Sequence, residues 1–411
     1  MFTRIYKIFV IGIFAVLLAG CMASSIQPEV MPMEKLIDEQ FQFAKRQYKV
    51  LMKNAAKDSM PRTWYSLENK FRNDHISSWI SGFYPATLWY IYEYTGDKEI
   101  LAEAEERLKL QEPMRHFTGN HDLGFMIYCP FGNAFRLTGK PEYKAVIVDA
   151  AKALSTRFRP QINSIQSWDS NRHFKCPVII DNMMNLELLY WASNESGDTT
   201  FRNIAERHAT ATLERHYRPN NSSWHVLDYD LATGQVIRRA TWQGLADSSA
   251  WARGQAWGLY GFTVMYRFTK DDRYLQQAHK IAQFMMNHPN LPNDKIPYWD
   301  YDANGDISVL RDASAGAIMA SALIELATFS KGNKKGAYID VAEAIIRSLA
   351  SPKYRAAVGE NGGFLLKHSV GALPLHNEID VPLTYADYYW LEAMLRYKKW
   401  VISKKAEVKQ G

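Results

Sequence analysis

The chain has 411 residues, of which 47% are hydrophobic and 22% are charged, enough for one large core or two domains. Its formal net charge of +6 is small and the sequence contains no dense cluster of basic residues, so the composition gives no support to nucleic acid as a partner. The same charge is compatible with a small anionic substrate.

The first 20 residues have the pattern of a secretory signal. Arg4 and Lys7 flank the start of the apolar run IFVIGIFAVLLAG, which is too short for a comfortable membrane span. The run ends in LAGC, and Leu18 lies three residues before Cys21, as in bacterial lipoprotein signals. A plain secretory signal that happens to contain a cysteine is the alternative. We expect cleavage before Cys21, lipidation of its thiol, and a tether over residues 21–33.

This signal also predicts the location of the mature chain. Removing residues 1–20 takes away Arg4 and Lys7 and no acidic residue, so the formal charge falls from +6 to +4. Met22, rather than an aspartate, follows Cys21, so nothing indicates retention at the inner membrane. We expect a protein that is lipid-anchored to the outer membrane, facing the periplasm or the cell surface.

Short polar turns recur along the rest of the chain. Each follows an apolar, aromatic helix candidate and precedes an amphipathic one. An amphipathic segment (34–54) comes first and an aromatic one (384–400) comes last, which makes six apolar and six amphipathic helices. The turns are YTGDKE (94–99), LTGKPE (137–142), ESGDTT (195–200), FTKDDR (268–273) and FSKGNK (329–334).

Six alternating pairs predict an all-α fold, a closed (α/α)6 barrel of six inner and six outer helices in a single domain over residues 34–411. An open solenoid is the alternative, but its inner helices would line an exposed face and should be more polar. The segments that lead into the apolar helices are long, and a ring places them all at one end. We therefore expect the functional site at the N-terminal ends of the inner helices, where the helix dipole favours anions.

Several polar and aromatic side chains fall at this end. Asp122, Asp181 and Asp312 begin predicted inner helices, where aspartate is also a favoured N-cap. Histidines there could be structural and tryptophans could be core. Aromatic rings stack on sugars and an arginine fork binds a carboxylate, so the combination favours recognition of a sugar acid. The other members are Trp79, His121, His225, Gln243, Arg253, Trp257 and His368.

Two of these aspartates suggest acid–base chemistry. Asp122 and Asp181 begin adjacent inner helices, although spacing alone does not show that they meet. If they face one another, they cannot both ionise easily, and one would hold a proton near neutral pH. Such a group could act as a general acid.

Metal ligands and a disulfide have little support. The sequence contains no CxxC and no HExxH, so we expect no metal and no cofactor. Cys129 and Cys176 could pair in an oxidising compartment, but buried thiols are the preferred interpretation.

Five segments resemble the unsaturated glucuronyl hydrolases, glycoside hydrolase family 88, over nearly the whole mature chain. The segments are NHDLGFM (120–126), VIIDNMMNLELLYWAS (178–193), ATWQGLADSSAWARGQAWGLYGF (240–262), IPYWDYDA (296–303) and DASAGAIMASALIEL (312–326). The resemblance implies an (α/α)6 barrel without metal or cofactor. It also implies removal of a 4,5-unsaturated glucuronic acid from the non-reducing end of lyase-generated oligosaccharides. That family hydrates the C4=C5 vinyl ether instead of displacing the glycosidic bond.

Residue roles follow from the same resemblance. Asp181 matches the general acid/base, and Asp122 matches the neighbouring carboxylate that supports its protonation and substrate placement. The positions that match sugar-binding residues are Trp79, His121, Phe125, His225, Gln243, Arg253 and Trp257.

The last long loop departs from the pattern of some relatives. Those acting on sulfated or amino-sugar substrates tend to have a basic residue within this loop. Here KHSVGALPLHNEIDVP (367–382) offers only Lys367 and His368 at its start and His376 further on. Fragments of glycosaminoglycan, ulvan, gellan or xanthan therefore all remain candidate substrates.

Three alternatives remain open. An unsaturated rhamnogalacturonyl hydrolase shares the fold and chemistry, but its acid motif usually has consecutive acids, whereas Asn182 follows Asp181 here. A sugar epimerase on the same barrel would use His121 and His225 as bases. A non-catalytic sugar-binding lipoprotein fits every feature except the carboxylate pair. The oligomeric state is not indicated.

Overall fold

The computed structural model describes residues 30–303 and 309–403, and within them all twelve predicted helical segments are present. The predicted signal sequence, Cys21 and most of the tether lie outside the described residues. The outer helices are α1 (Met33–Asn54), α3 (Lys98–Gln111), α5 (Pro141–Ser155), α7 (Thr199–Arg215), α9 (Asp272–Asn287) and α11 (Gly332–Ala350). The inner helices are α2 (Phe83–Thr95), α4 (Asn133–Thr138), α6 (Leu186–Ser196), α8 (Ala252–Thr269), α10 (Ala313–Thr328) and α12 (Thr384–Tyr397).

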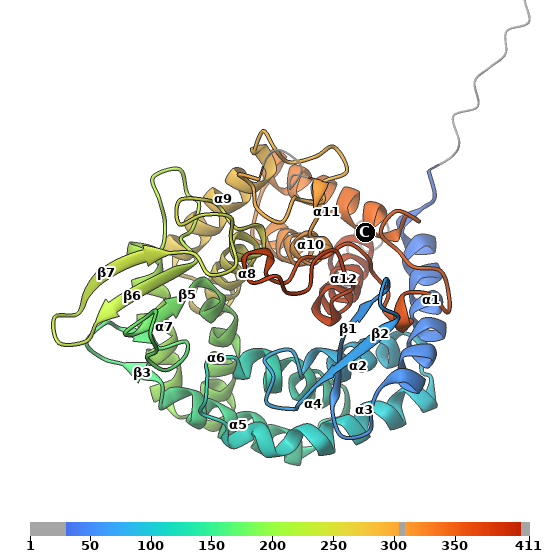
Figure 1. Cartoon of the computed structure of the whole chain (residues 1–411), viewed down its shortest axis with the longest axis horizontal. Coiled ribbons are helices and arrows are strands. Elements are labelled where there is room, and N and C mark those ends of the chain that lie inside the picture. Colours follow the sequence, from blue (N-terminus) through green and yellow to red (C-terminus); the bar gives the residue numbers. More distant parts are fainter. Residues whose placement is uncertain (1–29, 304–308, 404–411) are drawn as a thin grey trace, which may run out of the picture.

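The inner helices form a closed ring. Neighbouring inner helices are in contact around the ring, with α6 contacting inner helix two through the π-helical segment Gly124–Gly132, and α12 contacts α2, which closes the circle (Figure 1). The outer helices surround this ring, so the predicted (α/α)6 barrel is confirmed.

Residue composition explains which helices are inside. Every residue of α10 from Ala313 to Ala327 is buried, and so is every residue of α8 from Ala252 to Met265. Outer helices bury one face only, as the amphipathic pattern of α9 predicts. No helix of the described residues is both long and apolar enough to cross a membrane.

Inner helices two and three begin irregularly. A π-helix (Gly124–Gly132) precedes α4, and a 3₁₀-helix (Ile180–Asn185) precedes α6. The two irregular segments approach closely at Gly124, where an added Cβ would lie 2.7 Å from Asn185 Oδ1. Departures from α-helical geometry of this kind often occur at functional sites. Both predicted catalytic aspartates lie where these irregular segments begin.

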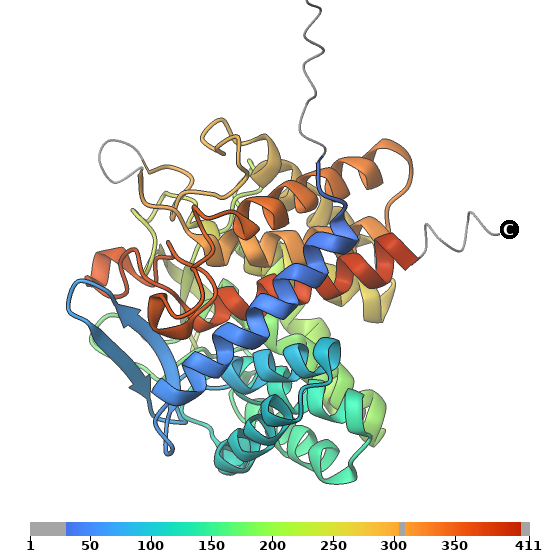
Figure 2. The ribbon, with the colours of Figure 1, turned by 90° about the vertical axis from the view of Figure 1, so that its right-hand side faces the viewer.

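Short antiparallel strands, which the sequence pattern did not predict, occupy the long loops. They lie at one end of the barrel, on the left in Figure 2, while the short turns lie at the other. The strands are β1 (Met60–Tyr65), β2 (Lys70–Asp74), β3 (Phe158–Arg159), β4 (Ser164–Ile165), β5 (Pro177–Ile179), β6 (Val226–Asp230) and β7 (Gln235–Ala240).

One of these sheets positions the site. Ile179 of β5 pairs with Val226 of β6, and the Ile180 N–H donates to the His225 carbonyl at 3.1 Å. The pairing therefore brings His225 beside Asp181, although 44 positions separate them in the chain.

Candidate active site

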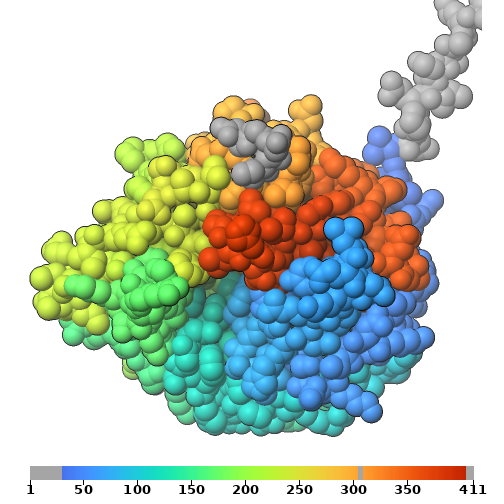
Figure 3. Space-filling view, viewed as in Figure 1, coloured from blue at the N-terminus to red at the C-terminus, as the bar shows by residue number. Residues whose placement is uncertain are grey.

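The two predicted catalytic aspartates lie at the end of the barrel that carries the long loops. A hollow opens on this face between the red loop near residue 375, the blue β1–β2 hairpin and the green residues near 170 (Figure 3). The side chains of Asp122 and Asp181 are 15% and 11% exposed, so both are mostly shielded from water.

Burial raises the proton affinity of both carboxyl groups. It raises the pKa of Asp122 to about 7, against a smaller opposing effect of Arg157. It raises the pKa of Asp181 to about 6; His121 and Arg253 oppose the rise, and the charge of Asp122 adds to it. Because the two groups influence each other, they titrate as a pair, and the pair retains a proton close to neutral pH.

The N-cap explanation fits one of the three aspartates. Asp312 accepts hydrogen bonds from the Ser314 N–H at 3.0 Å and the Ser314 hydroxyl at 2.5 Å, so it caps α10. Asp181 makes no capping hydrogen bond to its 3₁₀-helix. Its Oδ2 is buried and has no hydrogen-bond partner among the described residues, which leaves it available to a ligand.

His225 presents an N–H group to Asp181. Its Nδ1 accepts from the backbone N–H groups of Trp242 and Gln243, at 3.1 and 3.2 Å. Burial lowers the pKa of His225 to about 3, so the ring is neutral and its proton is on Nε2. Nε2 lies 3.7 Å from Asp181 Oδ2.

His121 has the corresponding arrangement beside Asp122. Its Nδ1 lies 3.2 Å from the amide nitrogen of Asn185, and its Nε2 lies 3.4 Å from Asp122 Oδ1. Burial lowers the pKa of His121 to about 4. A histidine base needs a free lone pair facing the substrate. Since Nε2–H of His225 faces Asp181, this ring presents no lone pair there, and the geometry disfavours an epimerase that uses His225 as a base.

Aromatic rings line the same region. Phe125 lies 5.7 Å from Trp79 and 5.1 Å from Trp257 between ring centroids. Tyr385, which the sequence analysis missed, lies 4.9 Å from Trp79. The structure thus brings together the three aromatic residues predicted to bind sugar, but Phe125 and Trp257 are buried in the core and only Trp79 is partly exposed. Nothing in its sequence context distinguished Tyr385 from the core aromatics of α12.

Trp251 is a second residue that the sequence analysis missed. Its ring lies 4.4 Å from the His225 ring, and the Arg253 guanidinium lies 4.6 Å from the Trp251 ring centroid. Its position in SAWARGQAW, two residues before Arg253, was the available signal.

The guanidinium of Arg253 was expected to bind a substrate carboxylate, but its N–H groups already have partners within the protein. It is 1% exposed, and its Nη1 donates to Asp312 Oδ2 at 2.9 Å and to the Val370 carbonyl at 2.6 Å. Its Nη2 donates to the Gly371 carbonyl at 2.7 Å, and Gln243 donates to the same carbonyl at 3.1 Å. In this structure Arg253 and Gln243 therefore hold the last loop (residues 367–382) over the site.

The basic side chains of that loop have other partners. Lys367 Nζ donates to the Pro352 carbonyl at 2.8 Å, and His368 Nδ1 lies 2.7 Å from Asp380 Oδ1. His376 is exposed. The loop is instead anchored by Glu378, which accepts from Arg62 of β1 at 2.5 and 2.8 Å.

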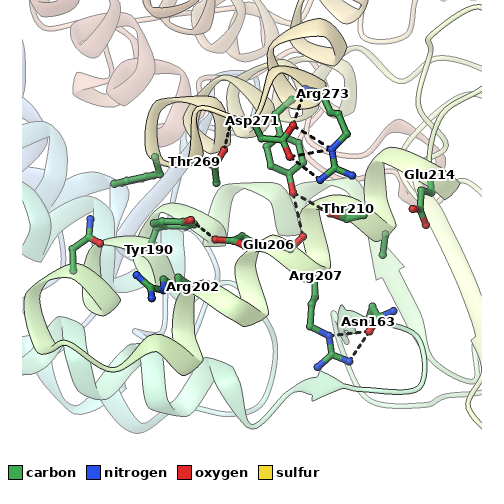
Figure 4. Close-up of a pocket in the computed structure, with 14 residues that line it drawn as sticks. Asn163, Tyr190, Arg202, Glu206, Arg207, Thr210, Glu214, Thr269, Asp271 and Arg273 are labelled. Atoms are coloured by element: carbon green, nitrogen blue, oxygen red, sulfur yellow. Dashed lines mark hydrogen bonds and ion pairs between the residues drawn. The ribbon is translucent and has the colours of Figure 1, made fainter.

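Two other cavities are present, one on the outside of the barrel and one that extends from its far end to Gly124 and Phe125, next to the candidate site. A groove of about 730 Å³ lies on the outside between α7 and α9, where charged groups pair with one another, such as Arg273 with Asp271 at 2.6 Å (Figure 4). A cavity of about 760 Å³ lies at the opposite end of the barrel, among the C-terminal halves of the inner helices. Its lining includes Glu187, Arg267 and Glu392.

The sequence also led to expectations for the two cysteines and for metal binding. Cys129 and Cys176 are both free thiols, as expected, and Cys176 is buried. Within residues 30–303 and 309–403, no group of three or more His, Cys, Asp and Glu side chains is arranged to hold a metal ion.

Comparisons with known proteins give a consistent result. The model of Glycosyl Hydrolase Family 88 matches residues 48–403. An unsaturated glucuronyl hydrolase of Formosa agariphila is 45% identical over 326 residues, 79% of this chain and 81% of that protein. The crystal structure of an unsaturated glucuronyl hydrolase specific for heparin is 44% identical, with a TM-score of 0.86 over 90% of this chain and 98% of the other.

A further solved structure contains a ligand. It is an Asp-to-Asn mutant of the unsaturated glucuronyl hydrolase of Streptococcus agalactiae, complexed with dGlcA-GalNAc6S. It is 26% identical to this chain, with a TM-score of 0.76, and covers 90% of this chain and 93% of the other.

Proposed function

The chain belongs to Glycosyl Hydrolase Family 88, and we propose from this premise that it is an unsaturated glucuronyl hydrolase. It releases 4,5-unsaturated glucuronic acid from the non-reducing end of oligosaccharides that polysaccharide lyases produce. The observation that carries this proposal is the buried pair Asp122 and Asp181, whose pKa values burial raises to about 7 and about 6. A carboxyl group that stays protonated near neutral pH can donate a proton to a carbon–carbon double bond.

The reaction is a hydration of the vinyl ether. Asp181 donates its proton to C4, which leaves positive charge shared between C5 and the ring oxygen. Water adds at C5, and the Asp181 carboxylate takes up the proton that the water releases. The resulting hemiketal opens to a C5 ketone, and the hemiacetal then present at C1 expels the remaining sugar as an alcohol.

Side chains around the pair have roles that fit these steps. Asp122, whose pKa of about 7 is the higher of the two, shares the proton of the pair, and its negative charge when ionised raises the pKa of Asp181. Nε2–H of His225 lies 3.7 Å from Asp181 Oδ2 and is free to bind substrate or the attacking water. Trp79, which is partly exposed, supplies aromatic surface for the sugar ring, while the buried rings of Phe125 and Trp257 pack behind it. Arg253 and Gln243 act on the sugar acid through the last loop.

A direct assay tests this function. The protein is incubated with unsaturated disaccharides prepared with different polysaccharide lyases, and loss of the ultraviolet absorbance of the double bond is followed. We expect the absorbance to fall with glucuronyl substrates. An unchanged signal with all of them, or turnover of rhamnogalacturonyl substrates alone, would contradict the proposal.

We propose that the residue after the cleaved bond is not held by a lysine of the last loop, because Lys367 Nζ is bound to the Pro352 carbonyl. The assay should therefore include sulfated and unsulfated glycosaminoglycan disaccharides together with ulvan, gellan and xanthan fragments. A preference that disappears in Lys367→Ala would contradict this proposal.

We propose further that the mature protein is anchored to the outer membrane by a lipid on Cys21, as the LAGC pattern indicates. Metabolic labelling with a fatty acid should mark the wild-type protein in a bacterial host and should not mark Cys21→Ser. Recovery of label in the variant would contradict the anchor.

A further inference from the structure

Asn185 lies where the starts of inner helices two and three meet, and it is fully buried. The Gly124 N–H donates to Asn185 Oδ1 at 2.8 Å, which turns the amide nitrogen of Asn185 the other way. That nitrogen lies 3.1 Å from Asn182 Oδ1 and 3.2 Å from His121 Nδ1. The amide therefore connects the backbone of the π-helix to a ring of the candidate active site.

A second contact fixes the same orientation. Asn182 Nδ2 donates to the Ile165 carbonyl at 2.8 Å and to Ser167 Oγ at 3.1 Å, so Asn182 Oδ1 is the atom that faces Asn185. An amide oxygen can only accept a hydrogen bond. The group of Asn185 that faces it must be NH₂, in agreement with the contact from Gly124.

An NH₂ group donates hydrogen bonds and accepts none. The His121 nitrogen that it faces must therefore carry a lone pair, which places the ring proton on Nε2, 3.4 Å from Asp122 Oδ1. We propose that Asn185 is a positioning residue that selects this tautomer of His121 and so keeps an N–H donor directed at the Asp122 carboxyl group.

The same contact disfavours the charged ring, because a proton on Nδ1 would point at the NH₂ group. The proton that the aspartates exchange with substrate and water is then not lost to His121. The groups whose charges bear on this ring are Asp122, Asp181, Arg157 and the buried imidazoles of His208 and His225. Burial lowers the pKa of His121 to about 4, although Asp181 and Asn182 act to raise it.

Histidine tautomers can be measured in the unmodified protein. With [15N]histidine labelling, nitrogen shifts and couplings report which ring nitrogen carries the proton, and His121→Gln identifies the His121 signals by their loss. We expect Nδ1 unprotonated and Nε2 protonated between pH 5.5 and 8. A proton on Nδ1, which Asn182 Oδ1 would then accept, would overturn the proposal. This experiment needs no substrate, so its failure is distinct from a failure of the proposed function.

Asn185→Asp provides the second arm. Aspartate keeps the size and the acceptor for Gly124, but it offers an oxygen to His121 Nδ1 where the NH₂ group had been. We expect Nδ1 to become protonated at neutral pH and kcat to fall about 10- to 100-fold with little change in KM, by analogy with groups that orient metal-binding histidines. The kcat readout rests on the proposed function.

Asn133→Asp is the matched control. Asn133 is also buried on inner helix two, but its amide donates to the Cys129 carbonyl and, among the described residues, makes no hydrogen bond to a histidine. This variant should keep the wild-type tautomer and kcat. A folded Asn185→Asp protein with the wild-type tautomer and kcat would contradict the proposal, and if that variant does not fold, the spectrum of the wild-type protein decides.

Discussion

Buried carboxylates occur at both ends of the barrel, in very different surroundings. At the end with the long loops, Asp181 Oδ2 has no hydrogen-bond partner among the described residues. At the other end, Glu392 accepts hydrogen bonds from Tyr90 at 3.0 Å, Tyr260 at 3.1 Å and Ser321 at 2.5 Å. Donors stabilise a carboxylate in its charged form, and burial without donors favours the neutral form. The difference separates a carboxylate that stabilises the fold from one that can transfer a proton.

A raised pKa alone does not distinguish a carboxyl group that transfers a proton from one that stabilises the fold. Burial raises the pKa of Asp387 to about 7, as it does for Asp122. Asp387 is fully buried and accepts from the backbone N–H groups of Leu365 and Leu366 and from the Tyr48 hydroxyl. Asp122 is partly open to the hollow. Access to a ligand, together with incomplete hydrogen bonding, identifies the working carboxylates.

The largest effect is expected for Asp181→Asn. Asparagine has nearly the same shape but cannot donate a proton to carbon, so kcat should fall about 1,000-fold or more, within the range for general acids. Substrate binding, measured by calorimetry, should stay within a few-fold of wild type. A variant that retains a tenth of wild-type kcat would remove Asp181 from the role of acid.

Asp122→Asn should have the next largest effect, about 100-fold on kcat, because Asp122 acts through the proton affinity of its neighbour. Without its negative charge, which raises the pKa of Asp181, the pH profile should also move to lower pH. Steady-state rates between pH 5 and 9 measure both effects. An unchanged profile would show that the two carboxyl groups do not interact.

Wild-type activity should fall as the pH rises above neutrality. Burial raises the pKa of Asp122 to about 7 and that of Asp181 to about 6, so the protonated acid is present below these values and is lost above them. We expect kcat/KM to decrease about tenfold per pH unit on the alkaline side. A carboxyl group with the ordinary pKa near 3.9 would be fully ionised across this range. A profile that is flat from pH 6 to 9 would contradict the assignment.

Glu392→Gln tests the other end of the barrel and should leave kcat within about threefold of wild type. The loss should appear in stability, because the hydroxyl groups of Tyr90, Tyr260 and Ser321 lose a charged acceptor, while Arg396 keeps Glu325 as an ion-pair partner at 2.9 Å. We expect a loss of about 1.5–3 kcal/mol, measured as the free energy of unfolding in urea. A large fall in kcat without a change in stability would mean that this end takes part in the reaction.

Helix periodicity was enough to predict the barrel, because burial on all sides and burial on one side leave different sequence patterns. The strands in the long loops were not predicted: β3, β4 and β5 have only two or three residues each, and the partly exposed β2 and the mostly exposed β7 lack the alternation of apolar and polar residues that marks a half-buried strand. Yet the pairing of β5 with β6 places His225 beside Asp181. Contacts between distant loops of this kind have no signature in local sequence.

The candidate site was predicted in part. Motif and position at the helix ends identified the carboxylates and most of the aromatic rings. Tyr385 was not predicted as a site residue, because every aromatic residue of an inner helix has the sequence pattern of a core residue. The partners of Arg253 could not be foreseen either, because the Val370 and Gly371 carbonyls that it binds are backbone atoms and lie more than a hundred positions away.

The position of oxygen from water in the product tests the central claim most directly. The reaction is run in H₂¹⁸O and stopped at early turnover with borohydride, and mass spectrometry of fragments locates the label. Hydration assisted by Asp181 predicts ¹⁸O at C5 of the released uronate, with the former ring oxygen at C1. Label at C1 would show ordinary glycosidic hydrolysis and would contradict the account.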